Sequence, residues 1–270
     1  MNRRRLTTTK KRIHLAAIPP LFRPPLRVLC RRILTRYPDT AALVVIGSVA
    51  LGSWEEDSDV DLVWVASGRR RKRWEEELDY HYDGVVELVL LNRSSLKAHV
   101  AERSSMAHAI AHGVALYDPH GLIRRIQETP LGPPTRQWMD KWFAFFCRRL
   151  EYGLESYRWE KSRHRRFCKG KCLCRVSEVL TRAVVNLARV LLATAGVVPN
   201  SKAETNREYP KMIHSPRLRR AMEIALNAHH EKRDLSLPEA AELARLGRWL
   251  RSQLVRILGK PGTANAPPRR

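Results

Sequence analysis

Three carboxylates stand in stretches of the chain that are otherwise apolar. Asp59 and Asp61 alternate with apolar residues, so both side chains leave the same face of one predicted strand. Glu87 is the single charged residue in the run Val85–Leu91, which predicts a second, buried strand. A divalent cation would neutralise all three charges, and ligand sets made only of oxygen atoms favour magnesium. We therefore predict that Asp59, Asp61 and Glu87 are metal ligands and catalytic residues.

A turn upstream of these acids supplies a second element of the same chemistry. Gly47 and Ser48 directly follow the apolar run Ala41–Ile46, which predicts a buried strand entering a turn. Glycine permits close backbone approach, and the Ser48 hydroxyl with neighbouring N–H groups can hold a phosphate. Positioned phosphates, a metal and a carboxylate near the attacking oxygen are what phosphoryl-type transfer requires. The sequence thus predicts a site for a nucleoside triphosphate.

The predicted elements around these residues form a small α+β domain. The hydrophobic pattern predicts helices at 26–37 and 94–111 and strands at 41–46, 59–65, 85–91 and 114–117. This order predicts a small mixed sheet with flanking helices.

Beyond about residue 131 the periodicity becomes helical. Helices are predicted at 138–157, 174–195, 216–228 and 238–258, which together form an all-α bundle. We expect a basic flexible tail at 1–24, the sheet domain at 25–130, the helical domain at 131–258 and a second flexible tail at 259–270.

Two short motifs resemble those of a known superfamily. Residues 47–52 read Gly-Ser-Val-Ala-Leu-Gly, and residues 58–62 read Ser-Asp-Val-Asp-Leu. Together with a third acid on a later strand, they resemble the signature of the DNA polymerase β-like nucleotidyltransferases. Within that superfamily, the chain is most similar to small prokaryotic proteins with a helical C-terminal domain, the group that includes the aminoglycoside nucleotidyltransferases. The resemblance is strong over residues 40–92 and only architectural after residue 118.

The resemblance implies an enzyme that moves NMP from an NTP, with ATP expected, to an acceptor hydroxyl and releases pyrophosphate. It implies magnesium, with two ions expected, held by Asp59 and Asp61. Gly47, Ser48 and Ser58 would contact the nucleotide.

Glu87 falls where the superfamily often has Asp. It would either bind metal or act as general base on the acceptor. Asp79 and Asp83 are alternatives for this third position, although they precede the predicted strand.

Further candidates depend on weaker signals. Lys202 and Lys211 lie in a basic segment predicted to be a loop between helices, which either reaches the triphosphate or is simply solvated. His108 and His112 are four residues apart on a predicted helix and are expected to pack beside the site. A basic stretch also carries a histidine and three cysteines, for which core or surface thiols are favoured over a metal site: His164, Cys168, Cys172 and Cys174.

The charge of the chain favours anionic partners without choosing among them. Fifty Lys and Arg against 27 Asp and Glu give a formal net charge of +23, which attracts triphosphates and nucleic acids. A basic nucleotide- or RNA-binding module, or an antitoxin-like regulator, is therefore the alternative function, although the long helical region argues against the regulator. The acceptor stays open among a small molecule, a protein and RNA, as does the oligomeric state.

The sequence predicts a soluble cytoplasmic protein. Five cysteines, an odd number, do not suggest a disulfide framework, and the apolar run Leu15–Ile18 is too short for a signal peptide. The most apolar later segment, Val184–Val198, contains Asn186 and Arg189 and is too short to span a bilayer. We therefore expect no membrane partner.

Overall fold

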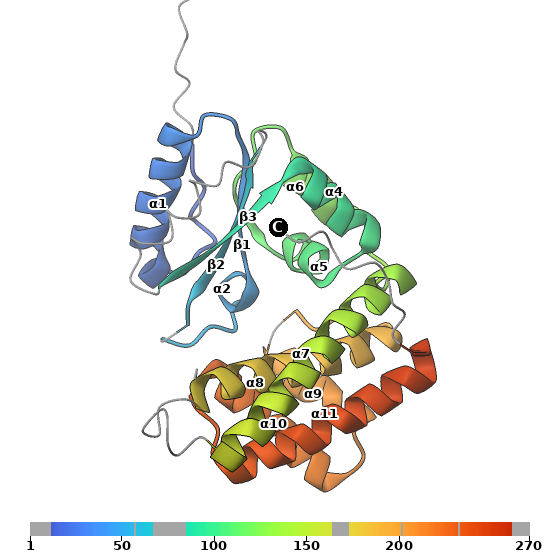
Figure 1. Cartoon of the computed structure of the whole chain (residues 1–270). Helices are drawn as coiled ribbons and strands as arrows, with labels where there is room; N and C mark the ends of the chain where they lie inside the picture. Colours follow the sequence, from blue (N-terminus) through green and yellow to red (C-terminus); the bar gives the residue numbers. More distant parts are fainter. Residues whose placement is uncertain are drawn as a thin grey trace, which may run out of the picture. The chain divides into compact units, whose positions relative to one another are not determined.

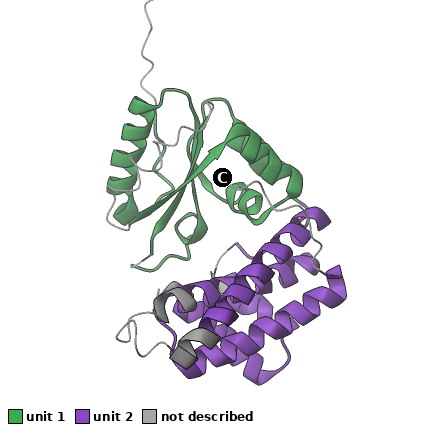
Figure 2. Cartoon of the chain, viewed as in Figure 1, with its two compact units in different colours: residues 1–131 green, residues 132–270 purple. Residues whose placement is uncertain are grey.

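The chain divides into two compact units, Met1–Leu131 and Gly132–Arg270 (Figure 2). The computed structural model describes residues 12–56, 58–66, 85–163, 173–200, 202–231 and 233–260, without the side chains of 158–163, 173–176, 202, 203 and 230. The described parts of the two units have separate hydrophobic cores.

The first unit contains the predicted small mixed sheet. Its strands are β1 (Thr40–Ile46), β2 (Val60–Ala66), β3 (Val86–Asn92) and β4 (Val114–Tyr117), in the order β3-β2-β1-β4. β1 is antiparallel to β2 and β4, and β2 is parallel to β3. Every residue of β1 is buried, because this strand lies inside the sheet and both of its faces are covered.

Helices cover both faces of the sheet (Figure 1). On one face α1 (Arg23–Arg36), preceded by the 3-10 turn η1 (Pro20–Phe22), shares a core with Leu62 and Trp64 of β2. On the other face α4 (Arg93–Glu102), α5 (Ser105–Ala111) and α6 (Leu122–Glu128) share a core with Val63 and Val65. The strict alternation along β2 therefore fixes which side chains face which helix layer.

The predicted N-terminal tail is wrong for residues 12–24. Leu15, Ile18 and Phe22 are buried in the same core as α1, and the His14 N–H donates to the Leu116 carbonyl of β4 at 2.9 Å. Prolines 24 and 25 do not interrupt this order, because they occupy the first turn of α1, where the backbone N–H groups have no intrahelical partner.

The single helix predicted over 94–111 is also wrong, because the structure breaks it in two. Arg103 ends α4 in the left-handed conformation, with φ 49°. The Ser104 hydroxyl then accepts the Ala107 N–H at 3.2 Å and caps α5. A serine side chain that satisfies a free N–H group favours a new helix start over continuation of the old helix.

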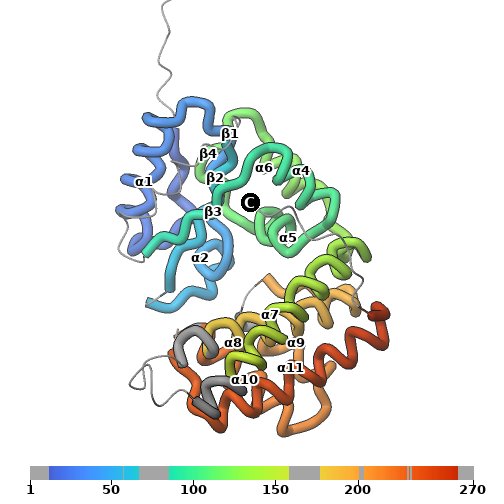
Figure 3. The backbone as a smooth tube through the Cα atoms, viewed as in Figure 1, coloured from blue at the N-terminus to red at the C-terminus, as the bar shows by residue number. Residues whose placement is uncertain are grey.

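The second unit is helical, as predicted. It contains α7 (Arg136–Arg163), α8 (Leu173–Thr194), α9 (Lys202–Met212), α10 (Pro216–His230) and α11 (Leu237–Leu258), which Figures 1 and 3 trace in order. The apolar helix α8 is central to this unit, since it contacts all four of the others. No helix within the described ranges combines the length and apolarity needed to cross a membrane.

The loop predicted around Lys202 and Lys211 is wrong, because that segment is helix α9. Its apolar side is anchored in the core of the unit by Tyr209, which is 3% exposed, and the side chain of Thr205 is also buried. Short polar sequences with few apolar residues carry a weak helical signal, so tertiary packing decides their conformation.

Candidate active site

One end of the sheet gathers the residues that the sequence selected. β1 runs antiparallel to β2 and β4, and β3 runs parallel to β2, so the end of β1 and the starts of the other three strands share one edge. Across that edge Ile46 of β1 is paired with Asp61 of β2, which is paired in turn with Glu87 of β3. Side chains of paired residues lie on the same face of a sheet.

Gly47 and Asp61 are in direct proximity at this edge. The short helix α2 (Gly47–Leu51) begins as soon as β1 ends, and Gly47 has φ 72°. A Cβ placed on Gly47 would lie 2.5 Å from Oδ2 of Asp61, which is far inside van der Waals contact. Glycine is therefore required twice, for the left-handed backbone and for the space that the carboxylate occupies.

Ser48 stands in the first turn of α2 and is half-buried. Its carbonyl accepts the N–H groups of Gly52 and Ser53, the latter at 3.0 Å, and Gly52 takes the left-handed conformation that ends the helix. The backbone of this turn is thus closed on itself. Within the described parts of the chain the Ser48 hydroxyl has no hydrogen-bond partner, which leaves it available to a ligand.

Asp59 and Asp61 are both half-buried at the start of β2. Val60 between them is fully buried towards α1, and its N–H donates to the Val85 carbonyl at 2.8 Å, which fixes this strand end against β3. By the alternation of strand side chains, the two carboxylates belong to the face opposite Val60.

The predicted burial of Glu87 is wrong. Glu87 is exposed, and most of β3 is only half-buried, because β3 is the edge strand of the sheet. An exposed carboxylate is solvated and needs no cation to be stable. The argument from desolvation therefore fails for Glu87, although its register beside Asp61 still places it at the edge described above.

The described residues contain no group of three His, Cys, Asp or Glu side chains close enough together to hold a metal ion. Asp59, Asp61 and Glu87 accordingly do not form a three-ligand cluster in this structure. Two neighbouring carboxylates nevertheless fit magnesium, which commonly binds one or two protein carboxylates and takes its remaining ligands from water and substrate phosphates.

The other predicted site residues differ in what the structure shows of them. The Ser58 hydroxyl accepts the Glu55 N–H at 2.8 Å and so stabilises the turn before β2.

In α9 the Lys211 ammonium forms an ion pair with Glu208 at 2.6 Å. His108 is buried in α5, whereas His112 at the end of that helix is exposed. Several predicted residues or side chains lie outside the described ones: Asp79, Asp83, His164, Cys168, Cys172, and the side chains of Cys174 and Lys202.

Gly113 is a residue of this edge that sequence reasoning missed. It precedes β4, and a Cβ there would lie 2.7 Å from the Val45 carbonyl oxygen and 3.1 Å from Cγ2 of Ile46. The glycine lets the chain after α5 approach the end of β1, next to Gly47. The available signal was a glycine directly after a helix, which ordinarily indicates only a helix end.

Comparison with known protein families identifies the domain to which the sheet and its edge belong. Residues 26–112 match the model of the nucleotidyltransferase domain, a range that runs from within α1 to the end of α5 and contains every residue of the shared edge described above except Gly113. This part of the chain is a nucleotidyltransferase domain. The protein is accordingly a transferase, and the chemistry of its class is transfer of a nucleotide.

Solved structures include distant neighbours of this nucleotidyltransferase. A nucleotidyltransferase-like protein from Exiguobacterium sibiricum is 14% identical, with 87% of this chain and 78% of that chain covered and a TM-score of 0.40. Spectinomycin adenyltransferase AAD(9) from Enterococcus faecialis, solved with ATP and spectinomycin, is 10% identical, with coverage of 84% and 97% and a TM-score of 0.49. No curated protein sequence matches the chain significantly.

Proposed function

We propose that this protein transfers NMP from a nucleoside triphosphate, with ATP as donor, to an acceptor hydroxyl in a magnesium-dependent reaction that releases pyrophosphate. The observation that carries the proposal is the Asp61 carboxylate held against the backbone of Gly47, with Asp59 two residues before it. That arrangement brings carboxylate oxygens next to the turn that carries the Ser48 hydroxyl, which is the combination that phosphate chemistry requires.

Each residue at the edge has a distinct role in this proposal. The absent side chain of Gly47 leaves room for the Asp61 carboxylate beside the turn, and the Ser48 hydroxyl donates a hydrogen bond to phosphate oxygens. Asp59 and Asp61 would hold magnesium, which when bound neutralises the charge that develops on the phosphates. Ser58 contributes through the turn that positions Asp59.

Glu87 acts on the acceptor in this proposal, since an exposed carboxylate beside Asp61 can meet a substrate that arrives from solvent. The acceptor oxygen forms a bond to the α-phosphorus while the bond to the bridging oxygen of pyrophosphate breaks. The proton of the acceptor hydroxyl passes to the Glu87 carboxylate, and pyrophosphate leaves with the bonding electron pair.

The first prediction concerns these acids. Asp59→Asn and Asp61→Asn are each expected to lower pyrophosphate release from ATP and magnesium by at least about 10³-fold, because each removes a charged oxygen ligand while keeping the side-chain shape. Glu87→Gln should lower turnover by about 10² to 10⁴-fold, as expected for loss of a general base. Each variant is incubated with each of the four labelled nucleoside triphosphates and with small-molecule, protein and RNA acceptor pools. The rates of pyrophosphate release and of label transfer to the acceptor measure these effects.

Asp140→Asn is the matched control, since Asp140 forms an exposed ion pair with Arg136 in the second unit. It should leave transfer unchanged. Full transfer in both Asp59→Asn and Asp61→Asn would refute the metal assignment. Unchanged turnover in Glu87→Gln alone would remove Glu87 from the reaction but leave the donor half of the proposal intact.

A further inference from the structure

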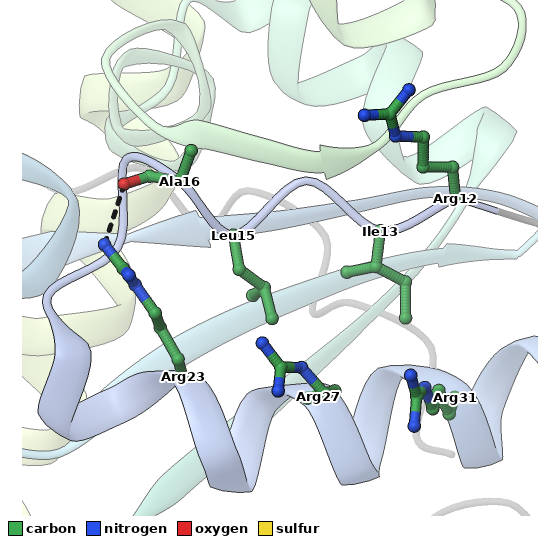
Figure 4. A pocket seen from close by; sticks show the side chains of 7 residues that line it. All are labelled: Arg12, Ile13, Leu15, Ala16, Arg23, Arg27 and Arg31. Carbon is green, nitrogen blue, oxygen red and sulfur yellow. Dashed lines mark hydrogen bonds between the residues drawn. The ribbon is translucent and has the colours of Figure 1, made fainter.

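A second candidate binding site lies on the opposite face of the sheet from Asp61. The extended segment 12–16 and helix α1 enclose an open pocket of about 630 Å³, shown in Figure 4. Four of its seven lining residues are arginines and none is acidic: Arg12, Ile13, Leu15, Ala16, Arg23, Arg27 and Arg31. The core beneath this pocket includes Leu62 and Trp64 of β2. Their side chains lie on one face of the strand, and that of Asp61 lies on the opposite face.

Three of the arginines form a row along α1. Arg23, Arg27 and Arg31 are spaced four residues apart, so each lies about 6 Å further along one flank of the helix than the one before. In Figure 4 the Arg23 side chain extends from α1 to Ala16, whereas those of Arg27 and Arg31 stay close to the helix. The guanidinium groups therefore follow a line instead of converging on one point.

Arg23 fixes the wall of the pocket. Its Nε donates to the Ile18 carbonyl at 2.6 Å and its Nη2 donates to the Ala16 carbonyl at 3.0 Å, which ties the extended segment to the start of α1. The pocket is thus formed by the folded protein before any ligand arrives.

Arg27 and Arg31 remain available to a ligand. Both are exposed, and neither has a hydrogen-bond or ion-pair partner among the residues that the structure describes. The neighbouring sequence carries no negative charge that could neutralise these arginines, since the first 38 residues contain eleven Lys and Arg and no Asp or Glu. Like charges held close together on one flank raise the free energy of the unliganded protein, and a bound polyanion relieves this repulsion.

We propose that the arginine row of α1, meaning Arg23, Arg27 and Arg31, binds the phosphate backbone of a nucleic acid strand. The exposed Arg27 and Arg31 contact the phosphates, while Arg23 holds the wall of the pocket beside them. Guanidinium groups contact phosphates with two N–H donors at once. A linear row matches successive phosphates of a strand better than it matches a compact anion, around which the cations would have to converge. Contacts to phosphates carry no information about the bases, so binding should be insensitive to base sequence.

Anisotropy of a labelled 12-nucleotide RNA, titrated with the full-length protein at several salt concentrations, tests the proposal. Arg27→Gln with Arg31→Gln should weaken binding by about tenfold or more near 50 mM salt. It should also reduce the slope of log K against log salt by about 1.4, because each phosphate contact on a single strand contributes about 0.7. The matched control is Arg248→Gln with Arg256→Gln, two exposed arginines of α11 with the same loss of charge.

Each outcome decides the proposal. A larger loss in the α1 pair than in the α11 pair, with both proteins folded by circular dichroism, supports it. Equal losses would show that net charge alone drives binding and would overturn it. Displacement of the RNA by tripolyphosphate at equivalent charge would indicate a compact-anion site and overturn it as well. DNA of the same length distinguishes the two sources of the backbone, and none of these measurements depends on transferase activity.

Discussion

Gly47, the first residue of α2, and Asp61 of β2 constrain each other. The carboxylate occupies the volume in which any side chain at position 47 would stand. The left-handed backbone at Gly47 adds a second reason for glycine, but that reason applies equally to Gly52, which has φ 73° and no atom within 4 Å of the place that a Cβ would take. Comparing substitutions at Gly47 and Gly52 therefore distinguishes the effect of backbone strain from the effect of moving the Asp61 carboxylate.

At the residue scale we predict that Gly47→Ala and Gly52→Ala have different effects. Both should lower the free energy of unfolding by about 1 kcal/mol, since alanine is strained in the left-handed region. Only Gly47→Ala displaces the Asp61 carboxylate, and a displacement of about 1 Å in a reacting group can cost about 10²-fold in rate. Pyrophosphate release and urea unfolding of both variants measure this, and equal activity in the two would contradict the role assigned to the Gly47–Asp61 contact.

At the scale of elements, the start of α11 combines a capping box with an ion pair to a residue that precedes the helix. The Ser236 side chain accepts the Glu239 N–H, and the Glu239 side chain accepts the Ser236 N–H at 2.8 Å. Arg233 adds an ion pair to the same carboxylate at 2.9 Å. Hydrogen bonds from Arg233 in the first place, and then from Ser236, lower the pKa of Glu239 to about 2 against the opposing effect of burial.

We therefore predict a pH-dependent contribution of Glu239 to stability. A carboxyl with a lower pKa in the folded than in the unfolded state stabilises the protein above its unfolded pKa, near 4.5, and loses this effect as pH falls towards 2. Glu239→Gln keeps the capping geometry but removes the charge, so it should cost about 0.5–1 kcal/mol at pH 7.

Urea unfolding of both proteins at pH 7, 4, 3 and 2 checks this expectation, and the difference should shrink to near zero at the lowest pH. Glu178→Gln, which breaks an exposed ion pair with Arg182 in α8, provides a comparison outside the capping box. A difference that stays constant with pH would show that the charge of Glu239 contributes nothing.

At the scale of the whole molecule, each of the two units has a buried cysteine that can report on its own core. Cys30 of α1 lies in the core of the first unit and Cys147 of α7 in that of the second. Burial raises the pKa of Cys30 to about 12 and that of Cys147 to about 11, so neither thiol is ionised near neutral pH.

We predict that both thiols are unreactive in the folded protein and become reactive when their own unit unfolds. Replacing Cys168, Cys172 and Cys174 by serine gives a protein whose remaining thiols are Cys30 and Cys147. Adding Cys147→Ser or Cys30→Ser then leaves a single thiol, which reports on the first or the second unit respectively. Thiol labelling at pH 8 across a urea series then gives one unfolding curve per unit. Labelling of either thiol at the rate of free cysteine without denaturant would contradict the prediction.

How much the sequence could predict depended on how local each feature was. The alternation around Asp61, the unbroken apolar run of β1 and the Gly47-Ser48 turn are encoded within a few residues, and the mixed sheet and the domain family followed from them. The exposure of Glu87 could not be predicted in this way. The same apolar run is buried in a central strand and half-buried in an edge strand, and strand order is a tertiary property.

The sequence by itself determined the domain family and selected the candidate residues, because carboxylates at alternate strand positions after a glycine turn are a pattern encoded within a few residues. Only the tertiary structure decided which of these groups touch. It placed the Asp61 carboxylate against Gly47, ordered residues 12–24 instead of leaving a tail, and formed an open pocket between that segment and the arginine row of α1. Such contacts join residues distant along the chain, and their energies become favourable only when the whole fold has brought the partners together.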